Sequence, residues 1–307
     1  MKKVAIVGYA QHPILENAGA LNEVELIMPV VHQLFDELGI SQNNIDFTCS
    51  GSCDYLQGAA FAFVEGLSAI QTNPPIKESH VEMDAAWAMY ESMLKIQMGD
   101  ADTALIYGFG KSSPGRLDSI ISLQMDPYYI SPLWPDRVSL AAIQARVLLE
   151  KNIITPEQMI TAVIEARTNS KNNKNALVTE LVDKEAYLAS EKISTPLNEF
   201  DCPPISDGSS AMIIASEEKA YEFTDHPIFI EGIDHRIESS NIGSRDLSKP
   251  TGILASIEQL KLEKTKFDVA ELHTQFSHEV PYLQSVLNLS DVPTNLSGGP
   301  LVGNVMM

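Results

Sequence analysis

The sequence predicts an α/β protein in which a mainly parallel sheet carries helices on its faces. Strand and helix patterns alternate over the first 110 or so residues, which is typical of this class. A second, looser series of the same kind begins at Pro227. Between the strands, residues 84–98 form a helix pattern that is apolar almost all round, and such a helix is normally buried.

The chain begins with a buried strand over residues 3–9. Asn22 then predicts the N-cap of a helix over residues 23–38, with Gly39 just beyond its end. Pro29 is expected to end or kink this helix. The next strand, residues 45–49, leads into a second helix over residues 56–70, which Asn73-Pro74-Pro75 breaks.

Residues 78–110 are the most distinctive stretch. A polar turn at residues 78–83 precedes the apolar helix, and a tight Gly99-Asp100 turn then leads to a strand over residues 103–107. A buried helix has a buried N-terminus, and its first N–H groups favour an anion or a reactive thiolate. We therefore expect any nucleophile at the entry to this helix.

Residues 112–195 are expected to be an insertion on the α/β core, with helices over residues 138–151 and 156–168. The core then resumes with a strand over residues 205–216 and a short helix at residues 219–223. The second series comprises short strands and helices, over residues 228–233, 251–260, 269–272, 279–287 and 294–296.

Composition excludes several classes of function. The 307 residues are enough for one large or two ordinary domains, and the net charge of −20 argues against nucleic acid and anionic membranes. No apolar run approaches the ~20 residues that span a bilayer, and the N-terminal segment fits a strand better than a signal peptide. Three cysteines provide no disulfide framework, so a reducing cytoplasm is expected.

Three clusters contain residue types suited to chemistry. Cys49 and Cys53 at a strand end are either buried structural thiols or a reactive thiol, because no further ligand pair supports a zinc site. In His80-Val81-Glu82-Met83-Asp84 the acidic groups charge the helix N-terminus, or Glu82 acts as acid or base. No metal site is predicted there.

The third cluster is Glu271-Leu272-His273-Thr274-Gln275-Phe276-Ser277-His278-Glu279, at a predicted strand end. His273 is either a functional donor or base or a structural hydrogen-bonding group, and His278 is a weaker candidate. The turn Ser297-Gly298-Gly299 is either a plain loop or a place where backbone closely approaches a substrate.

The order of these motifs resembles the thiolase superfamily. KVAIVGYA, IQMGDADTALIYGFGKSS, DPYY, SDGSSAMIIAS, ELHTQFSHE and NLSGG occur in the family's order, and the sterol-carrier-protein-type or lipid-transfer-protein branch is the most similar. The resemblance implies two pseudo-symmetric βαβαβαββ halves in a five-layered α-β-α-β-α core. The halves would be residues 1–225, with a loop domain at about 112–195, and residues 226–307. A full-length relative would continue beyond Met307, so the second half is expected to be incomplete.

The resemblance also implies specific departures at the site. A thiolase has a nucleophilic cysteine at the N-terminus of the buried helix, where the alignment places Glu82 or a close neighbour; the chain has no cysteine from Asp54 to Asp201. His273 matches the oxyanion-hole position and is kept. The remaining candidate acids and bases are Glu82, His278 and the tyrosines Tyr128, Tyr129 and Tyr282. The substrate would be a coenzyme A thioester, with no tightly bound cofactor and no metal, and Ser297, Gly298 and Gly299 would contact it.

These departures argue against standard thiolase chemistry, which needs a thiolate acyl carrier. The function expected is a retro-aldol cleavage of a β-hydroxyacyl-CoA, for example a steroid or lipid side chain, by a homodimer or with a small OB-fold/zinc-ribbon partner. Two alternatives remain: an inactive acyl-CoA- or lipid-binding subunit, and a thiolase that uses Cys49 or Cys53.

Overall fold

The computed structural model describes residues 2–57, 61–72 and 75–305. Two compact units divide the chain. Unit 1 comprises Met1–Gly115, Ile205–Ile233 and Val305–Met307, and unit 2 comprises Arg116–Pro204 and Asp234–Asn304. The predicted insertion and most of the second series thus share one unit, whereas the expected boundary between the halves, at residues 225 and 226, stays a prediction.

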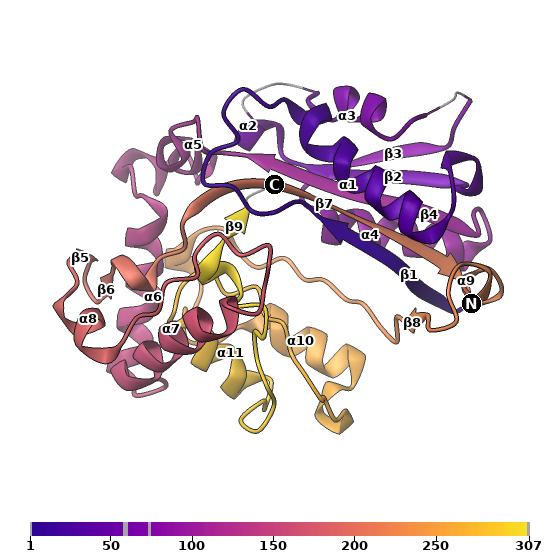
Figure 1. Ribbon diagram of the computed structural model, residues 1–307. Helices are drawn as coiled ribbons and strands as arrows, with labels where there is room; N and C mark the ends of the chain where they lie inside the picture. The colour runs from indigo at the N-terminus through magenta and orange to yellow at the C-terminus, as the bar shows by residue number, and fades with distance from the viewer. Residues whose placement is uncertain (1, 58–60, 73–74, 306–307) are drawn as a thin grey trace. The chain divides into compact units, whose positions relative to one another are not determined.

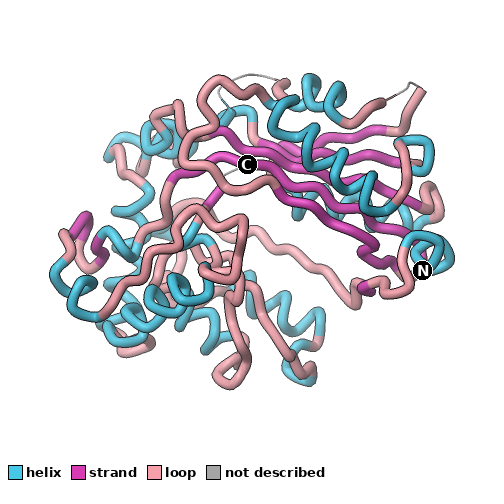
Figure 2. Tube along the Cα trace, in the orientation of Figure 1, coloured by secondary structure: helices cyan, strands magenta, loops and turns pink. Residues whose placement is uncertain are grey.

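A mixed sheet is the centre of unit 1 (Figures 1 and 2). Its strands lie in the order β3-β2-β4-β7-β1-β8, and a short β9 (Asn304–Val305) also pairs with β7. The bounds are β1 (Val4–Gln11), β2 (Phe47–Ser52), β3 (Glu78–Glu82), β4 (Thr103–Lys111), β7 (Ile205–Ser216) and β8 (Ile228–Phe229).

The prediction of a mainly parallel sheet is wrong for the strands on the β7 side of β4. β2 runs parallel to β3 and β4, whereas β7 is antiparallel to both of its neighbours, β4 and β1. The reason is the long excursion through residues 116–204, after which β7 enters the sheet from the opposite end. Residues 78–82, predicted as a turn, form the edge strand β3 because they pair with β2.

Helices cover both faces of this sheet (Figure 1). α1 (Glu23–Leu38) and α3 (Phe63–Ala69) pack on one face with Leu105, Tyr107 and Phe109, while α4 (Ala85–Met98) packs on the other with Ala104 and Ile106. Successive side chains of β4 therefore point to opposite faces of the sheet, as the two-residue period of a strand requires. The remaining helices of the unit are α2 (Asp54–Gln57) and α9 (Glu217–Phe223).

The capping prediction for α1 is confirmed. The Asn22 side chain accepts from the Glu25 N–H in a capping box, and Gly39 ends the helix in the left-handed conformation. The helix continues through Pro29, so the expectation that Pro29 ends it is wrong, whereas a kink there stays a prediction. Burial of one whole helix face holds the helix together. Residues 58–60 of the next predicted helix, and residues 73–74 of its predicted break, lie outside the described residues.

Unit 2 is mainly helical, with two apolar clusters. Val138, Leu148, Phe276 and Tyr282 belong to the first, and Val163, Leu301 and Val302 to the second. The elements are α5 (Leu117–Gln124), α6 (Arg137–Glu150), α7 (Pro156–Ser170), α8 (Lys184–Ala189), the hairpin β5 (Lys192–Ser194) and β6 (Leu197–Asn198), α10 (Thr251–Leu260) and α11 (Glu279–Val286), with short 3-10 turns at Ser131–Leu133, Glu199–Asp201, Ile242–Ser244, Leu262–Lys264 and Pro300–Val302.

The strands predicted for the second series are short or single bridges. Of residues 228–233, only Ile228–Phe229 are a strand, and they pair with β1 of the first sheet. Residues 269–272 and 294–296 meet in one parallel bridge, Ala270 with Thr294. An extended segment forms a strand only where a neighbouring segment pairs with it through backbone hydrogen bonds. Each of these segments has one partner in the described chain, so its strand stays short.

Candidate functional site

The N-terminus of α4 is closed by a carboxylate from its own chain. Asp84 is the N-cap, and its Oδ1 accepts from the N–H groups of Ala86 at 3.0 Å and Trp87 at 3.2 Å. The negative charge also suits the positive end of the helix dipole. The residue at the place predicted for a nucleophile is therefore Asp84, and Glu82 lies two residues earlier on β3.

The expected burial of this helix is only partly observed. Its buried residues are Ala88, Ser92, Met93 and Ile96, whereas Met98 is 82% exposed. Glu82, Met83 and Asp84 at the entry are also exposed. One face of α4 packs on the sheet of unit 1, and Leu94 and Met98 are exposed.

Backbone from β2 passes directly beside this N-terminus. A Cβ atom added to Gly51 would lie 2.3 Å from the carbonyl oxygen of Asp84 and 2.7 Å from the nitrogen of Ala85. Both neighbours are backbone atoms, so neither can rotate away. Gly51 therefore permits an approach of strand and helix that no other residue type allows.

Glu82 belongs to a hydrogen-bonded chain that ties β3 to its surroundings. The parallel register places Ser50 opposite His80, and His80 Nδ1 lies 2.9 Å from Ser50 Oγ. His80 Nε2 lies 3.4 Å from Glu82 Oε2, and the other oxygen of Glu82 accepts from the Asp54 N–H at 2.7 Å. Phe63 stacks on the His80 ring at 4.0 Å. These contacts hold Glu82 as a structural link between β3 and α2.

The cysteines are poorly placed to act as nucleophiles. Cys49 is fully buried in β2, and burial, with a smaller effect of Glu91, raises the pKa of its thiol to about 12. Burial also raises the pKa of the Cys202 thiol to about 12. Cys53 is half-buried just after β2. Within residues 2–57, 61–72 and 75–305, no group of three or more His, Cys, Asp or Glu side chains could hold a metal ion.

In unit 2, a buried aspartate anchors the segment that leads to α11. The Asp201 carboxylate accepts from the hydroxyls of Ser277 and Tyr187, the latter at 2.6 Å, and from the Asn198 N–H at 2.8 Å. Ser277 N–H also donates to the Asp201 carbonyl at 3.1 Å. Three donors satisfy this buried carboxylate and fix the position of residues 276–279.

Two of the predicted catalytic residues lie in the core of unit 2. His278 is fully buried, its Nε2–H donates to Gln144 Oε1 at 3.2 Å, and burial lowers its pKa to about 4, so the ring is neutral. Tyr282 is 4% exposed within an apolar cluster, and its pKa is raised to about 12 mainly by burial. Tyr128 and Tyr129, by contrast, are highly exposed.

His273 is exposed and lies in a segment that contacts the glycine-rich turn. Glu271 accepts from the N–H of Ser297 at 3.0 Å and from its hydroxyl at 2.7 Å. Asn295 accepts from the Leu272 N–H at 2.6 Å. The fold therefore brings together two segments that were predicted separately, the one with His273 and the one with Ser297.

Positive backbone angles explain the two glycines of this turn. Gly298 has φ +92° and Gly299 has φ +61°. A Cβ atom on Gly298 would in addition meet the Ala166 carbonyl oxygen at 3.0 Å. Their close approach is to protein backbone and side chains of unit 2, and contact with a substrate stays a prediction.

A cavity of about 310 Å³ lies within unit 2 and combines apolar walls with charged groups. Arg137 contributes two buried guanidinium nitrogens, Nε and Nη1, that have no hydrogen-bond partner among the described residues. Glu279 contributes a half-buried carboxylate. The lining comprises Ile121, Met125, Arg137, Leu140, Ala141, Gln144, Ser240, Ile242, Arg245, Leu247, Gln275, Phe276 and Glu279.

Sequence reasoning missed the polar residues of this cavity. Glu279 is part of the quoted ELHTQFSHE motif, but its electrostatics depend on the fold: burial raises its pKa to about 7, although the Phe276 N–H donates to its carboxylate at 3.1 Å. Arg137 follows the DPYY segment at the start of α6, far from Glu279 in the chain. Only folding brings the two into one cavity.

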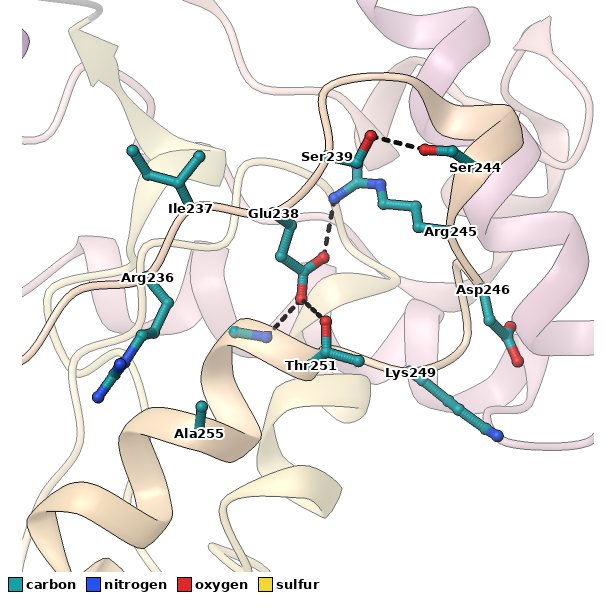
Figure 3. A pocket seen from close by; sticks show the side chains of 11 residues that line it. Arg236, Ile237, Glu238, Ser239, Ser244, Arg245, Asp246, Lys249, Thr251 and Ala255 are labelled. Carbon is teal, nitrogen blue, oxygen red and sulfur yellow. Dashed lines mark hydrogen bonds and ion pairs between the residues drawn. The ribbon is translucent and has the colours of Figure 1, made fainter.

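A second cavity of about 570 Å³ lies beside α10 and is more polar (Figure 3). Arg236, Arg245 and Lys249 contribute cationic side chains to it, and Glu238 and Asp246 contribute anionic ones. Glu238 accepts from the Gly252 N–H at 2.5 Å, from Thr251 at 2.9 Å and from Arg245 at 3.0 Å. Arg245 lines both cavities, so the two adjoin at this side chain.

Known proteins with similar sequences include two acetyl-CoA acetyltransferases and a sterol carrier protein. The acetyl-CoA acetyltransferase of Methanocaldococcus jannaschii is 26% identical over 295 residues, which cover 90% of this chain and 74% of that protein. The acetyl-CoA acetyltransferase of Methanothermobacter thermautotrophicus is 30% identical over 146 residues, 45% of this chain and 38% of that protein. Sterol carrier protein 2 of Bos taurus is 25% identical over 211 residues, 62% and 39% of the two chains. No protein-family model matches the chain.

Solved structures establish the fold. Human mitochondrial 3-ketoacyl-CoA thiolase superposes with a TM-score of 0.76 at 16% identity, over 99% of this chain and 88% of its own. The chain therefore has the fold of the thiolases. The Ltp2-ChsH2(DUF35) aldolase superposes with a TM-score of 0.75 at 19% identity, over 97% and 85% of the two chains.

The helix entry differs chemically from what the resemblance to thiolases implies. That resemblance implies a cysteine at the N-terminus of this helix, whereas Asp84 caps α4. Within the described residues, no helix is long and apolar enough to cross a membrane.

Proposed function

We propose that this protein cleaves a carbon–carbon bond of a β-hydroxyacyl-CoA by a retro-aldol reaction, acting with a partner subunit. The observation that carries the proposal is the Asp84 carboxylate at the N-terminus of α4 in a thiolase fold. Thiolysis and Claisen condensation need a thiolate there to carry the acyl group. A carboxylate that accepts from two backbone N–H groups does not carry an acyl group as a thiolate does. We therefore propose a different reaction of the same substrate class.

A retro-aldol cleavage needs fewer groups than acyl transfer. One base removes the proton of the β-hydroxyl, and donors stabilise the enolate that forms on the thioester oxygen. The similarity to an aldolase of the same fold supports this reaction type. The raised pKa values of Cys49 and Cys202 argue in the same direction.

His273 is the enolate donor that the resemblance to thiolases implies. It is exposed, and its segment is held against the Ser297 turn by Glu271. The burial of His278 and Tyr282, and the hydrogen bonds of Glu82 to unit 1, make these three residues poorer candidates for the base than their residue types indicate.

The reaction is tested by mass spectrometry of the purified protein with β-hydroxyacyl-CoA substrates, alone and with the small OB-fold/zinc-ribbon partner. We expect a shortened acyl-CoA and a carbonyl product in equal amounts. His273→Ala should lower kcat about 10²-fold, as loss of one oxyanion donor does, whereas the exposed control His226→Ala should not. Unchanged turnover in His273→Ala would exclude the donor role; no cleavage of any substrate with the partner present would exclude the reaction.

An inactive acyl-CoA- or lipid-binding subunit is the second candidate, which the similarity to sterol carrier protein 2 supports. The two cavities that adjoin at Arg245, one largely apolar and one charged, suit a ligand with an acyl end and an anionic end. Tight binding of acyl-CoA without turnover, with the partner present, would favour this function over the lyase.

Association with a second chain is proposed through the free edge of the sheet. β3 is an edge strand of five residues whose outer side has no partner among the described residues. Edge strands offer unpaired N–H and C=O groups to another strand. Sedimentation velocity should report a homodimer, or a heteromer with the OB-fold protein; a monomer under both conditions would contradict the proposal.

A further inference from the structure

The small cavity of unit 2 contains a guanidinium group with two buried donors that have no hydrogen-bond acceptor among the described residues. Arg137 lies at the first position of α6, with its side chain 13% exposed. Its Nη2 donates to the Pro203 carbonyl at 3.4 Å, and its Nε lies 3.8 Å from Asp118, too far for a hydrogen bond. Nε and Nη1 therefore remain buried donors without acceptors in the described chain. Buried donors of this kind normally have a partner, and the cavity is where an acceptor oxygen of a ligand fits.

The same cavity contains a carboxyl group whose pKa is raised by burial. Burial raises the pKa of Glu279 to about 7. Hydrogen bonds from the backbone N–H groups of Phe276 and Gln275 lower this pKa, but their effect is smaller. The other charged groups around the cavity are Arg137 and Arg245. A carboxyl with a pKa near 7 can take up and return a proton during one turnover.

The rest of the lining limits the ligand to a small, partly apolar group. Its apolar residues include Ile121, Met125, Leu140, Ile242 and Phe276. At about 310 Å³ the cavity is at the small end of ligand sites. It is large enough for the reacting end of an acyl thioester, and Arg245 connects it to the larger charged cavity.

We propose that Glu279 is the base and Arg137 the oxygen-binding donor for the retro-aldol cleavage, which makes this inference dependent on the proposed function. The Glu279 carboxylate takes the proton of the β-hydroxyl, and the bond between the α and β carbons breaks. Its electron pair forms the enolate, whose oxygen accepts from Nε and Nη1 of Arg137, and the β carbon leaves as a ketone or aldehyde. The protonated Glu279 then returns the proton to the α carbon, so that one β-hydroxyacyl-CoA yields one carbonyl compound and one acyl-CoA.

Two assays on the complex with its partner test the assignment. The first is steady-state cleavage of a β-hydroxyacyl-CoA. The second is exchange of the α protons of acetyl-CoA with D2O, followed by NMR, which needs no carbonyl product. Glu279→Gln should lower kcat about 10²- to 10⁴-fold with little change in KM. Arg137→Gln should lower kcat about 10²- to 10³-fold. Both variants should lose proton exchange in the same proportion.

Matched controls come from the same helical unit. Arg146→Gln removes an exposed arginine of α6, and Glu165→Gln removes an exposed glutamate of α7. Both controls should retain wild-type rates. If Arg137→Gln does not fold, Arg137→Lys is the second variant. It retains the positive charge but lacks the planar guanidinium with its fixed donors. Wild-type kcat in Arg137→Lys would overturn the role of Arg137.

The outcomes separate the inference from the function on which it depends. Normal cleavage and exchange in Glu279→Gln would overturn the assignment and leave the reaction standing. Exchange in the wild type that is lost in both variants, without cleavage of any substrate, would support the pair and refute the retro-aldol reaction. A wild-type protein without cleavage or exchange would refute both.

Discussion

Replacing Gly51 by Ala should displace the N-terminus of α4 from the sheet. The added Cβ would lie 2.3 Å from the Asp84 carbonyl oxygen, whereas ordinary contacts begin at 3.4 Å, so strand and helix have to separate by about 1 Å. Overpacking of this kind typically costs 1–3 kcal/mol. Loss of the Asp84 cap would add about 1 kcal/mol. We therefore expect the free energy of unfolding to fall by about 3 kcal/mol.

The assay is thermal unfolding followed by circular dichroism, with urea unfolding as a second measurement. For a cooperative unit of 150–250 residues, a loss of about 3 kcal/mol lowers Tm by roughly 6–12 °C. Gly243→Ala is the control, because its Cβ would be 3.3 Å from the end of the flexible Asn241 side chain. If Gly51→Ala melts within 2 °C of wild type, the close approach of β2 and α4 is not as described.

Four further predictions concern buried and capping groups. Asp84→Ala should lower the free energy of unfolding by about 1 kcal/mol, and an unchanged urea midpoint would contradict its capping role. Asp201→Asn replaces a buried carboxylate that accepts three hydrogen bonds, and it should lower the free energy of unfolding by about 1–3 kcal/mol in the same measurement. Because the pKa of Glu279 rises from 4.5 to about 7 on folding, the native state binds more protons between these values. The free energy of unfolding should therefore fall as pH rises from 4.5 to 7, by at most about 1.4 kcal/mol per pH unit, relative to Glu279→Gln; parallel pH profiles would refute this. Native alkylation with iodoacetamide should leave Cys49 and Cys202 unmodified, and rapid labelling of either would revive the thiolase alternative.

Local features of the fold were predictable because their causes are local. The helix from Glu23 to Leu38 begins at Asn22 and ends at Gly39 as the capping rules require. The Asp84 cap similarly begins α4 at the place where the apolar pattern starts. By contrast, residues 78–82 contain no strong strand pattern, and they form β3 only because β2 supplies a ladder of hydrogen bonds.

The site residues were harder to predict from the sequence than the fold, because their chemistry depends on burial. His278 and Tyr282 have the residue types of acids and bases, but burial keeps the ring of the first neutral and raises the pKa of the second. Glu279 was overlooked because an unperturbed glutamate is fully ionised at neutral pH. Desolvation, which no local pattern encodes, changes that.

The sequence by itself predicted the thiolase fold, which the solved structures confirm, and it contains no cysteine from Asp54 to Asp201. Motif order and residue identity are sufficient for both, because neither depends on which distant segments meet. Only the tertiary structure decided that Glu82 belongs to the edge strand β3, and that Arg137 and Glu279 line one cavity. Both depend on the packing of segments far apart in the chain, which sets burial and therefore the charge and partners of each group.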